Sequence, residues 1–150
     1  QAIFNMDASF QLPEPGLVHQ NEMPALVPPA LERVPRELKQ DAFLAWRHEH
    51  KILKEDLPHA PRQHVWFRTN GAVPDDPALH VCLLVYESDN ALLSTGRLPH
   101  RGSFDRARLQ MASLDHAMWF HQPAVAAWRA DQWLLYALDS PSSSSARCYN

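Results

Sequence analysis

A short apolar segment, residues 77–88, constrains the fold of this chain more than any other feature. Its sequence is PALHVCLLVYES, and His80 is the one polar residue before its last two positions. Asp75 or Asp76 supplies a helix N-cap just before it, and Pro77 suits the first helical position. A helix that is apolar on nearly all sides has no face to turn toward water. We therefore predict a buried helix, which only a curved sheet or a larger partner can cover.

Strand-like sequences lie on both sides of this helix in the chain. RQHVWFRTNG, residues 62–71, is typical of a strand that ends in an Asn-Gly turn. A loop rich in Gly, Pro and Arg, residues 94–110, precedes a strand predicted for residues 111–121. Residues 131–139 and the serine-rich C-terminal stretch predict two more strands. This order predicts an α+β fold with an antiparallel sheet wrapped around one buried helix, which is the hot-dog architecture.

The first sixty residues differ in character from the rest. Residues 1–12 carry β-formers and predict one strand. Eight of the 13 prolines lie from Pro13 to Pro61 inclusive, which argues against a continuous sheet or a single long helix there. We interpret residues 13–60 as a Pro-rich linker with one amphipathic helix at residues 36–56.

Composition excludes several classes of function. The net charge of −3 favours neither nucleic acid nor an anionic membrane as a partner. No apolar stretch reaches the roughly 20 residues of a membrane span, and QAIFNMDASF lacks the features of a secretory signal. Cys82 and Cys148 are expected to be free thiols, with Cys82 a small buried hydrophobe. We therefore expect a reducing compartment.

Two residues are candidates for chemistry. Ser113 stands with other polar residues inside LQMASLDHAMWFHQP, where strand alternation puts it on the same face as Asp115. It is a nucleophile, a ligand of a water, or a hydroxyl that bonds within the sheet, and no G-x-S-x-G elbow surrounds it. Asp89 follows the helix, where the helix dipole disfavours a charged carboxylate. It is a candidate base or water-orienting group, or it ends the helix in solvent.

Other polar and aromatic residues have simpler interpretations. His116 and His121 lie on opposite faces of the predicted strand, and His48 and His50 face different sides of a helix, so no metal site is expected. Asp115 is most simply bonded to the backbone or to a histidine. The loop arginines are interpreted as solvated, with attraction of a phosphate as the alternative: Arg97, Arg101, Arg106 and Arg108. Three tryptophans are expected in the core: Trp66, Trp119 and Trp133.

Taken together, these motifs resemble a known family. SLDHAMWFHQP, with YESD upstream and DQWLLYALDSPSSSSAR downstream, resembles the second repeat of type II acyl-CoA thioesterases, the double hot-dog enzymes of bacteria and peroxisomes. ASFQLPEPGLVHQNEMP resembles the end of their first repeat. The resemblance implies a terminal strand of a first repeat at residues 1–12, a linker at 13–60, and a second repeat at 61–150 that lacks its last strand or strands.

The resemblance also implies a reaction. In that family an Asp after the central helix, a Ser or Thr on the next strand and a Gln on a later strand hold the attacking water. Asp89 in YESD and Ser113 in ASLDH match the first two, and the Gln is expected beyond Asn150, since neither Gln122 nor Gln132 stands at the motif position. The implied function is hydrolysis of fatty acyl-CoA to fatty acid and CoA, without cofactor or metal.

Alternatives and departures remain at this point. A non-catalytic hot-dog module that binds an acyl chain or another subunit is the main alternative, and a Ser113 acyl-enzyme is a weaker one. Gln122 stands where the family commonly has Arg, and Cys148 where it commonly has Gly. The expected setting is a homo-oligomer formed through hot-dog sheets, in the cytoplasm, or in a peroxisome if the source is eukaryotic.

Overall fold

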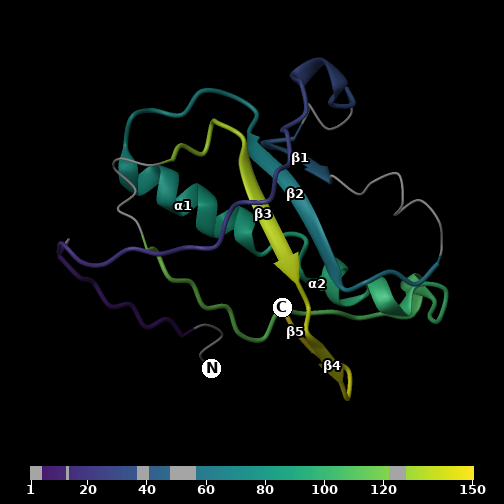
Figure 1. Cartoon of the computed structure of the whole chain (residues 1–150). Helices are drawn as coiled ribbons and strands as arrows, with labels where there is room; N and C mark the ends of the chain where they lie inside the picture. Colours follow the sequence, from purple (N-terminus) through teal and green to yellow (C-terminus); the bar gives the residue numbers. More distant parts are fainter. Residues whose placement is uncertain (1–4, 13, 37–40, 48–56, 122–127) are drawn as a thin grey trace.

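The computed structural model describes residues 5–12, 14–36, 41–47, 57–121 and 128–150. In these residues the regular elements are three paired strands, two α-helices, a C-terminal hairpin (Figure 1) and three short 3-10 helices at Leu31–Arg33, Leu98–His100 and Arg106–Arg108. Within this described part, no helix is long and apolar enough to cross a membrane. Helices and antiparallel strands together confirm the predicted α+β class.

The sheet has the order β1-β2-β3 and is antiparallel throughout. β2 (Arg62–Thr69) lies between β1 (Phe43–Arg47) and β3 (Leu134–Asp139). The strand predicted within residues 62–71 is thus confirmed at Arg62–Thr69, and the strand predicted over residues 131–139 is confirmed at Leu134–Asp139. The core centres on β2, where three consecutive residues are buried, with one buried residue from each neighbouring strand: Val65, Trp66, Phe67, Leu44 and Leu138.

β1 corrects one prediction. Residues 36–56 were expected to form an amphipathic helix, but Phe43–Arg47 form an edge strand, with Trp46 opposite Trp66. Aromatic and branched side chains favour a pleated surface, and the ladder with β2 satisfies backbone groups that a short isolated helix leaves partly open. Leu44 gains burial by this pairing, at 3% exposure. The stretches 37–40 and 48–56 lie outside the described residues.

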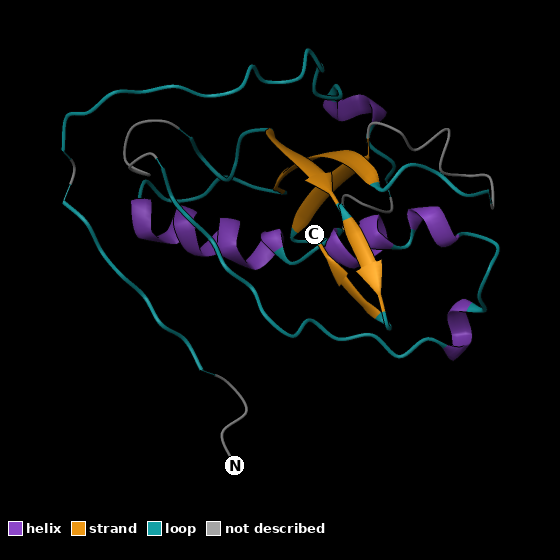
Figure 2. Ribbon diagram, turned by 60° about the horizontal axis from the view of Figure 1, so that its bottom comes forward, coloured by secondary structure: helices purple, strands orange, loops and turns teal. Residues whose placement is uncertain are grey.

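The predicted helix is present as α1 (Pro77–Ser88). Asp76 is its N-cap, because Asp76 Oδ1 accepts from the Ala78 amide at 2.9 Å. Its expected complete burial is wrong, since Tyr86 is 71% exposed and Cys82 is also exposed. The described strands lie to one side of α1, whose N-terminal end reaches away from them (Figures 1 and 2). A three-stranded sheet is too small to wrap the helix.

The buried positions of α1 are polar rather than apolar. They are His80, Glu87 and Ser88. His80 Nδ1 accepts from the buried Ala130 amide at 3.2 Å, which ties the first turns of the helix to the segment before β3. The polar residue of the apolar run is therefore one of its anchors.

Residues 111–121 differ most from the prediction. They were expected to be a strand but form no regular element, and Trp119 is 76% exposed instead of lying in the core. A strand requires a neighbour whose backbone groups complete a ladder, and no described strand pairs with this segment. It runs extended alongside α1 (Figures 1 and 2).

The N-terminal segment shows the same lack of pairing. Residues 5–12 are exposed and form no strand, so the strand predicted for residues 1–12 is absent from its described part. The assignment of that stretch to a first repeat stays a prediction.

The C-terminal region completes the described chain. α2 (Leu92–Gly96) follows α1 after Ala91, whose φ of 73° makes a sharp left-handed turn. The fully buried Gln63 Nε2 of β2 donates to Ala91 O at 3.2 Å and to Thr95 Oγ1 at 2.6 Å, which fixes this turn to the sheet. β4 (Ser142–Ser144) and β5 (Arg147–Tyr149) then form a hairpin, so the predicted final strand is a pair of short ones.

Candidate functional site

A cavity of about 1150 Å³ lies where the sheet, the end of α1 and the extended segment meet. Most of its wall is apolar, with Trp66 and Phe67 from β2 and Leu84 from α1. Residues 110–119 form another side, and the C-terminal hairpin contributes residues 146–150. Asp89 and Ser113 both line it. A long apolar space with a few polar groups on its wall is the usual form of a small-molecule site.

The two residues singled out from the sequence are in direct contact. Ser113 Oγ donates to Asp89 Oδ1 at 2.9 Å, although 24 positions separate them in the chain. Asp89 is the C-cap of α1, and Ser113 belongs to the extended segment beside that helix end. The Asp89 side chain is 58% exposed. Its other oxygen, Oδ2, has no hydrogen-bond partner among the described residues, so this oxygen is available to accept from a water.

A second group reaches the same carboxylate oxygen. His116 Nδ1 lies 3.9 Å from Asp89 Oδ1, and the opposite ring nitrogen, Nε2, lies 3.0 Å from Ser88 Oγ. The imidazole therefore bridges the last residue of α1 and the residue that caps it. Strand alternation had put His116 on the face opposite Ser113. Because the segment is not a strand, that alternation does not hold, and both side chains reach Asp89.

Ser88 anchors the polar cluster that it forms with Asp89, Ser113 and His116. It is 6% exposed, and its hydroxyl also lies 2.7 Å from Val85 O and 3.3 Å from Met118 Sδ. Its carbonyl accepts from the Tyr136 hydroxyl of β3 at 3.0 Å. Burial raises the pKa of Tyr136, and the nearby charge of Asp89 raises that pKa further, so Tyr136 remains a donor. Sequence reasoning missed Ser88 and Tyr136, and no local pattern marks either of them.

Glu87 precedes Ser88 in the chain, but its side chain bonds to Asn90 rather than to the cluster. The residue is 5% exposed, and desolvation by burial raises the pKa of its carboxyl group, while the hydrogen bond from Asn90 Nδ2 at 2.9 Å opposes that rise. It is absent from the cavity wall. Glu87 therefore serves the helix end rather than the site.

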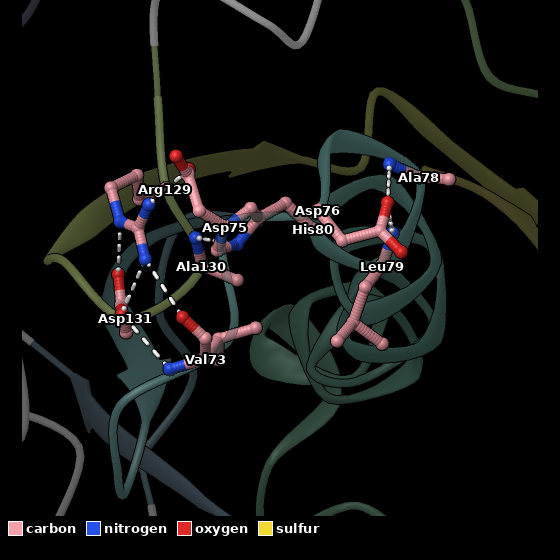
Figure 3. A network of polar contacts seen from close by, with 9 residues as sticks. All are labelled: Val73, Asp75, Asp76, Ala78, Leu79, His80, Arg129, Ala130 and Asp131. Atoms are coloured by element: carbon pink, nitrogen blue, oxygen red, sulfur yellow. Dashed lines mark hydrogen bonds and ion pairs between the residues drawn. The ribbon is translucent and has the colours of Figure 1, made fainter.

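A polar brace holds the start of α1 and so the direction of the helix (Figure 3). Arg129 bonds to Asp131 at 2.9 Å, to Asp75 at 2.8 Å and to the carbonyl of Val73 at 2.8 Å. Asp131 Oδ2 in turn accepts from the Val73 amide at 3.0 Å. The Arg129 guanidinium and this amide hold the pKa of Asp131 well below its usual range. The brace joins the loop before α1 to the segment before β3.

The remaining sequence candidates take no part in the cluster. Asp115 and His121 are exposed, and no three His, Cys, Asp or Glu side chains of the described residues gather as metal ligands. Trp66 is buried as predicted, whereas Trp119 is not. Cys82 and Cys148 are free thiols as predicted, but Cys82 is exposed rather than buried. Arg97 Nη1 lies 3.6 Å from Met111 Sδ, so it packs along the extended segment.

Comparison with known proteins identifies the family. Residues 38–150 match the family model described as acyl-CoA thioesterase. The chain belongs to the acyl-CoA thioesterase family. Acyl-coenzyme A thioesterase 8 of Mus musculus is 34% identical over 173 residues, covering 98% of this chain and 52% of the mouse protein. Acyl-CoA thioesterase 2 of Haemophilus influenzae is 32% identical over 162 residues, covering 97% of this chain and 55% of that protein.

A solved structure of the same family agrees with these relatives. The crystal structure of acyl-CoA thioesterase II TesB2 from Mycobacterium marinum superposes with a TM-score of 0.72 and 40% sequence identity. It covers 92% of this chain and 50% of the mycobacterial one. The resemblance predicted from the motifs is thus confirmed. This thioesterase-family chain spans about half the length of the curated relatives it matches.

Proposed function

We propose that the protein hydrolyses fatty acyl-CoA thioesters by attack of a water held between Asp89 and Ser113. One observation carries the proposal: the 2.9 Å hydrogen bond that joins these two side chains on the wall of a large apolar cavity. Membership of the acyl-CoA thioesterase family supports this choice of reaction. The apolar walls suit an acyl chain, and the polar cluster stands where the thioester carbonyl would lie.

The reaction follows from the geometry of the pair. Ser113 donates to one oxygen of Asp89, so the other oxygen accepts a proton from water while the Ser113 oxygen accepts a second hydrogen bond. The carboxylate removes the proton as the water oxygen attacks the carbonyl carbon. The tetrahedral oxyanion then collapses, the carbon–sulfur bond breaks, and the CoA thiolate takes the proton from Asp89. One thioester and one water thus give one carboxylic acid and one thiol.

We propose the domain organisation, the third catalytic group, the assembly and the location of the protein together with this reaction. Residues 61–150 are the second repeat of a double hot-dog, with residues 1–12 from the end of a first repeat and 13–60 between them, where β1 joins the sheet of the second repeat. The third group, a Gln, lies beyond Asn150 and shares the water with Asp89 and Ser113. The partner is acyl-CoA, the assembly is a homo-oligomer formed through hot-dog sheets, and the location is the cytoplasm, or the peroxisome in a eukaryote.

Replacement of Asp89 tests the proposal. Asp89→Asn in the full-length protein should lower kcat for palmitoyl-CoA about 10²- to 10⁴-fold, the range for loss of a general base. Release of free thiol is measured, and circular dichroism confirms the fold. Asp139→Asn is the matched control, because Asp139 is an exposed carboxylate of β3 outside the cavity wall. A kcat within threefold of wild type in Asp89→Asn contradicts the proposal.

The same assay distinguishes the alternatives. Tight binding of palmitoyl-CoA by the wild-type protein without thiol release would indicate a non-catalytic acyl-binding module. A burst of thiol with an acyl adduct on Ser113 would indicate a covalent route. No histidine bonds to Ser113 in the described part of the chain, so the serine–histidine pair of a serine hydrolase is not formed there. The water mechanism therefore fits the cluster better.

A further inference from the structure

We propose that His116 is a positioning residue that directs a protonated Nδ1 at Asp89 and holds that carboxylate in the orientation needed for water attack. The inference rests on the proposed function for its kinetic consequences. Its structural content, the position of one proton, is independent of any activity.

The Asp89 side chain requires a second restraint besides Ser113. Its side chain is 58% exposed at the end of a helix, and Ser113, which donates to it, is exposed as well. A carboxylate held by one hydrogen bond from an exposed segment has more than one accessible rotamer. His116 is only 30% exposed in its side chain and approaches the same oxygen, Oδ1, at 3.9 Å. Both contacts are on Oδ1, so Oδ2 keeps no partner among the described residues.

The neighbours of His116 determine which ring nitrogen carries the proton. Ser88 has a single hydroxyl proton, and both Val85 O at 2.7 Å and His116 Nε2 at 3.0 Å are within its reach. If Nε2 alone carried the ring proton, the Nδ1 lone pair would face the carboxylate 3.9 Å away, which is repulsive. With the proton on Nδ1, the Asp89 contact is attractive, and Nε2 accepts from Ser88 once the hydroxyl turns from Val85 O, to which it donates at 2.7 Å. The charge of the carboxylate therefore favours protonation at Nδ1.

Ser88, which contacts the imidazole, is itself held in place. Ser88 is 6% exposed, and its carbonyl receives the Tyr136 hydroxyl at 3.0 Å, so the end of α1 is tied to β3. His116 thus transmits the position of a buried residue to an exposed carboxylate. This is the arrangement expected where catalytic groups are held by packed neighbours.

The same groups also have the connectivity of a hydrolase triad, with Ser88 bonded to His116 and His116 beside Asp89. Burial argues against that role. A nucleophile must meet the substrate carbonyl, but Ser88, although part of the cavity wall, is 6% exposed and its hydroxyl donates to the Val85 carbonyl at 2.7 Å. The chain Ser88, His116, Asp89 therefore orients the acid rather than activating the serine.

Substitutions at His116 in the full-length protein separate the two ring nitrogens. An Asn amide reaches the Nδ1 position and a Gln amide the Nε2 position, so His116→Asn keeps the Asp89 contact and His116→Gln keeps the Ser88 contact. With palmitoyl-CoA, His116→Ala and His116→Gln should lower kcat about 10- to 100-fold with KM within threefold, and His116→Asn should recover most of the kcat. His121→Asn, an exposed histidine of the same segment outside the cavity wall, is the control.

The kinetic outcomes decide between the roles. A better rescue by Gln than by Asn, or a kcat of wild-type size in His116→Ala, overturns the proposal. Ser88→Ala should lower kcat less than His116→Ala does. Complete loss of turnover in Ser88→Ala, with an acyl adduct on Ser88 in the wild type, overturns it in favour of the triad.

A spectroscopic measurement tests the proton itself. Ring ¹⁵N spectra of labelled wild-type protein at neutral pH should show His116 protonated at Nδ1, and Asp89→Asn should weaken that preference. Protonation at Nε2 alone overturns the inference, even in an active enzyme. If the wild type releases no thiol from any acyl-CoA, the proposed function fails, and the ring spectrum still decides the role of His116.

Discussion

Asp89 is the residue on which the site depends, because one of its oxygens receives both Ser113 and His116. A carboxylate at a helix C-terminus meets no backbone donors, since the last carbonyls there point toward it. Side chains from elsewhere in the chain must supply the donors. The extended segment provides the hydrogen bond from Ser113 and, three residues further on, the His116 imidazole at 3.9 Å, which is why this short stretch matters to the chemistry.

The hydroxyl of Ser113 is the feature that the site requires, rather than serine itself. Ser113→Thr keeps the donor to Asp89 and should retain at least a third of the wild-type kcat, because an extended backbone accommodates a branched residue. Ser113→Ala removes the donor and should lower kcat about 10- to 100-fold, as loss of an orienting group does. Thiol release from palmitoyl-CoA measures both. Equal turnover in the two variants would show that the hydroxyl has no role.

At this scale the sequence predicted Asp89 and Ser113 but not the residues that hold them. Asp89 and Ser113 stood out because their local motifs resemble those of a family. His116 was visible as an unusual polar residue, but its contact with Asp89 depends on how the extended segment lies against α1. Ser88 and Tyr136 look like an ordinary helix end and an ordinary strand tyrosine. Their link, 48 positions apart, exists only in the folded chain.

At the scale of elements, α1 is a case in which local sequence determines where the helix begins and tertiary packing determines how far it is buried. Its limits follow from local chemistry: Asp76 caps it, and Pro77 occupies its first position. Its burial does not, because burial depends on how many strands surround it. The run FLAWR illustrates the same point, since its strand state is set by pairing with β2 and its sequence also suits a helix. Residues 109–121 have a strand-like sequence without a described partner strand.

The N-cap of α1 offers a direct test of its local stabilisation. Asp76→Ala removes the acceptor for the Ala78 amide and should lower the free energy of unfolding by about 1 kcal/mol. Asp76→Asn retains an oxygen acceptor and should lose less than half of that. Urea unfolding followed by circular dichroism measures both variants. A larger loss in Asn than in Ala would show that this cap does not stabilise α1 through its hydrogen bond.

Gly96 tests the contact between α2 and the C-terminal hairpin. A Cβ there would lie 3.0 Å from Cys148 Sγ and 3.1 Å from Cys148 Cβ, so the Cys148 side chain must shift by a few tenths of an ångström to accept it. Gly96→Ala should therefore lower the free energy of unfolding by about 1–3 kcal/mol despite the better helix propensity of Ala. Gly71→Ala is the control, because nothing lies within 4 Å of its added Cβ. A rise in the urea midpoint of Gly96→Ala would contradict this packing.

At the scale of the whole molecule, polar ties rather than a large core join the helices to the sheet. Gln63 fixes α2 to β2, Tyr136 fixes the end of α1 to β3, and the Arg129 brace fixes the loop before α1. Ionisable groups near these ties make the stability of the fold depend on pH. Burial raises the pKa of Glu87, so its effect is to weaken the fold as pH rises above about 4.5, where the unfolded chain ionises first.

Asp131 acts in the opposite direction. The Arg129 guanidinium and the Val73 amide hold the Asp131 pKa well below its ordinary value of 3.8, so the folded chain binds this proton less readily than the unfolded chain does. Its stabilisation is therefore complete above that ordinary value and is lost as the pH falls toward the folded pKa. In water, the brace should favour the fold at neutral pH and release it in acid.

Asp131→Asn tests this linkage. The wild type should exceed the variant in free energy of unfolding by a constant amount at pH values above about 5, and that difference should shrink steadily as the pH is lowered toward about 2. Urea unfolding at a series of pH values measures it. In an Arg129→Ala background, where the guanidinium that lowers the Asp131 pKa is gone, most of the pH dependence should disappear. A wild-type difference that stays constant from neutral to acid pH would show that Asp131 is not held by the brace.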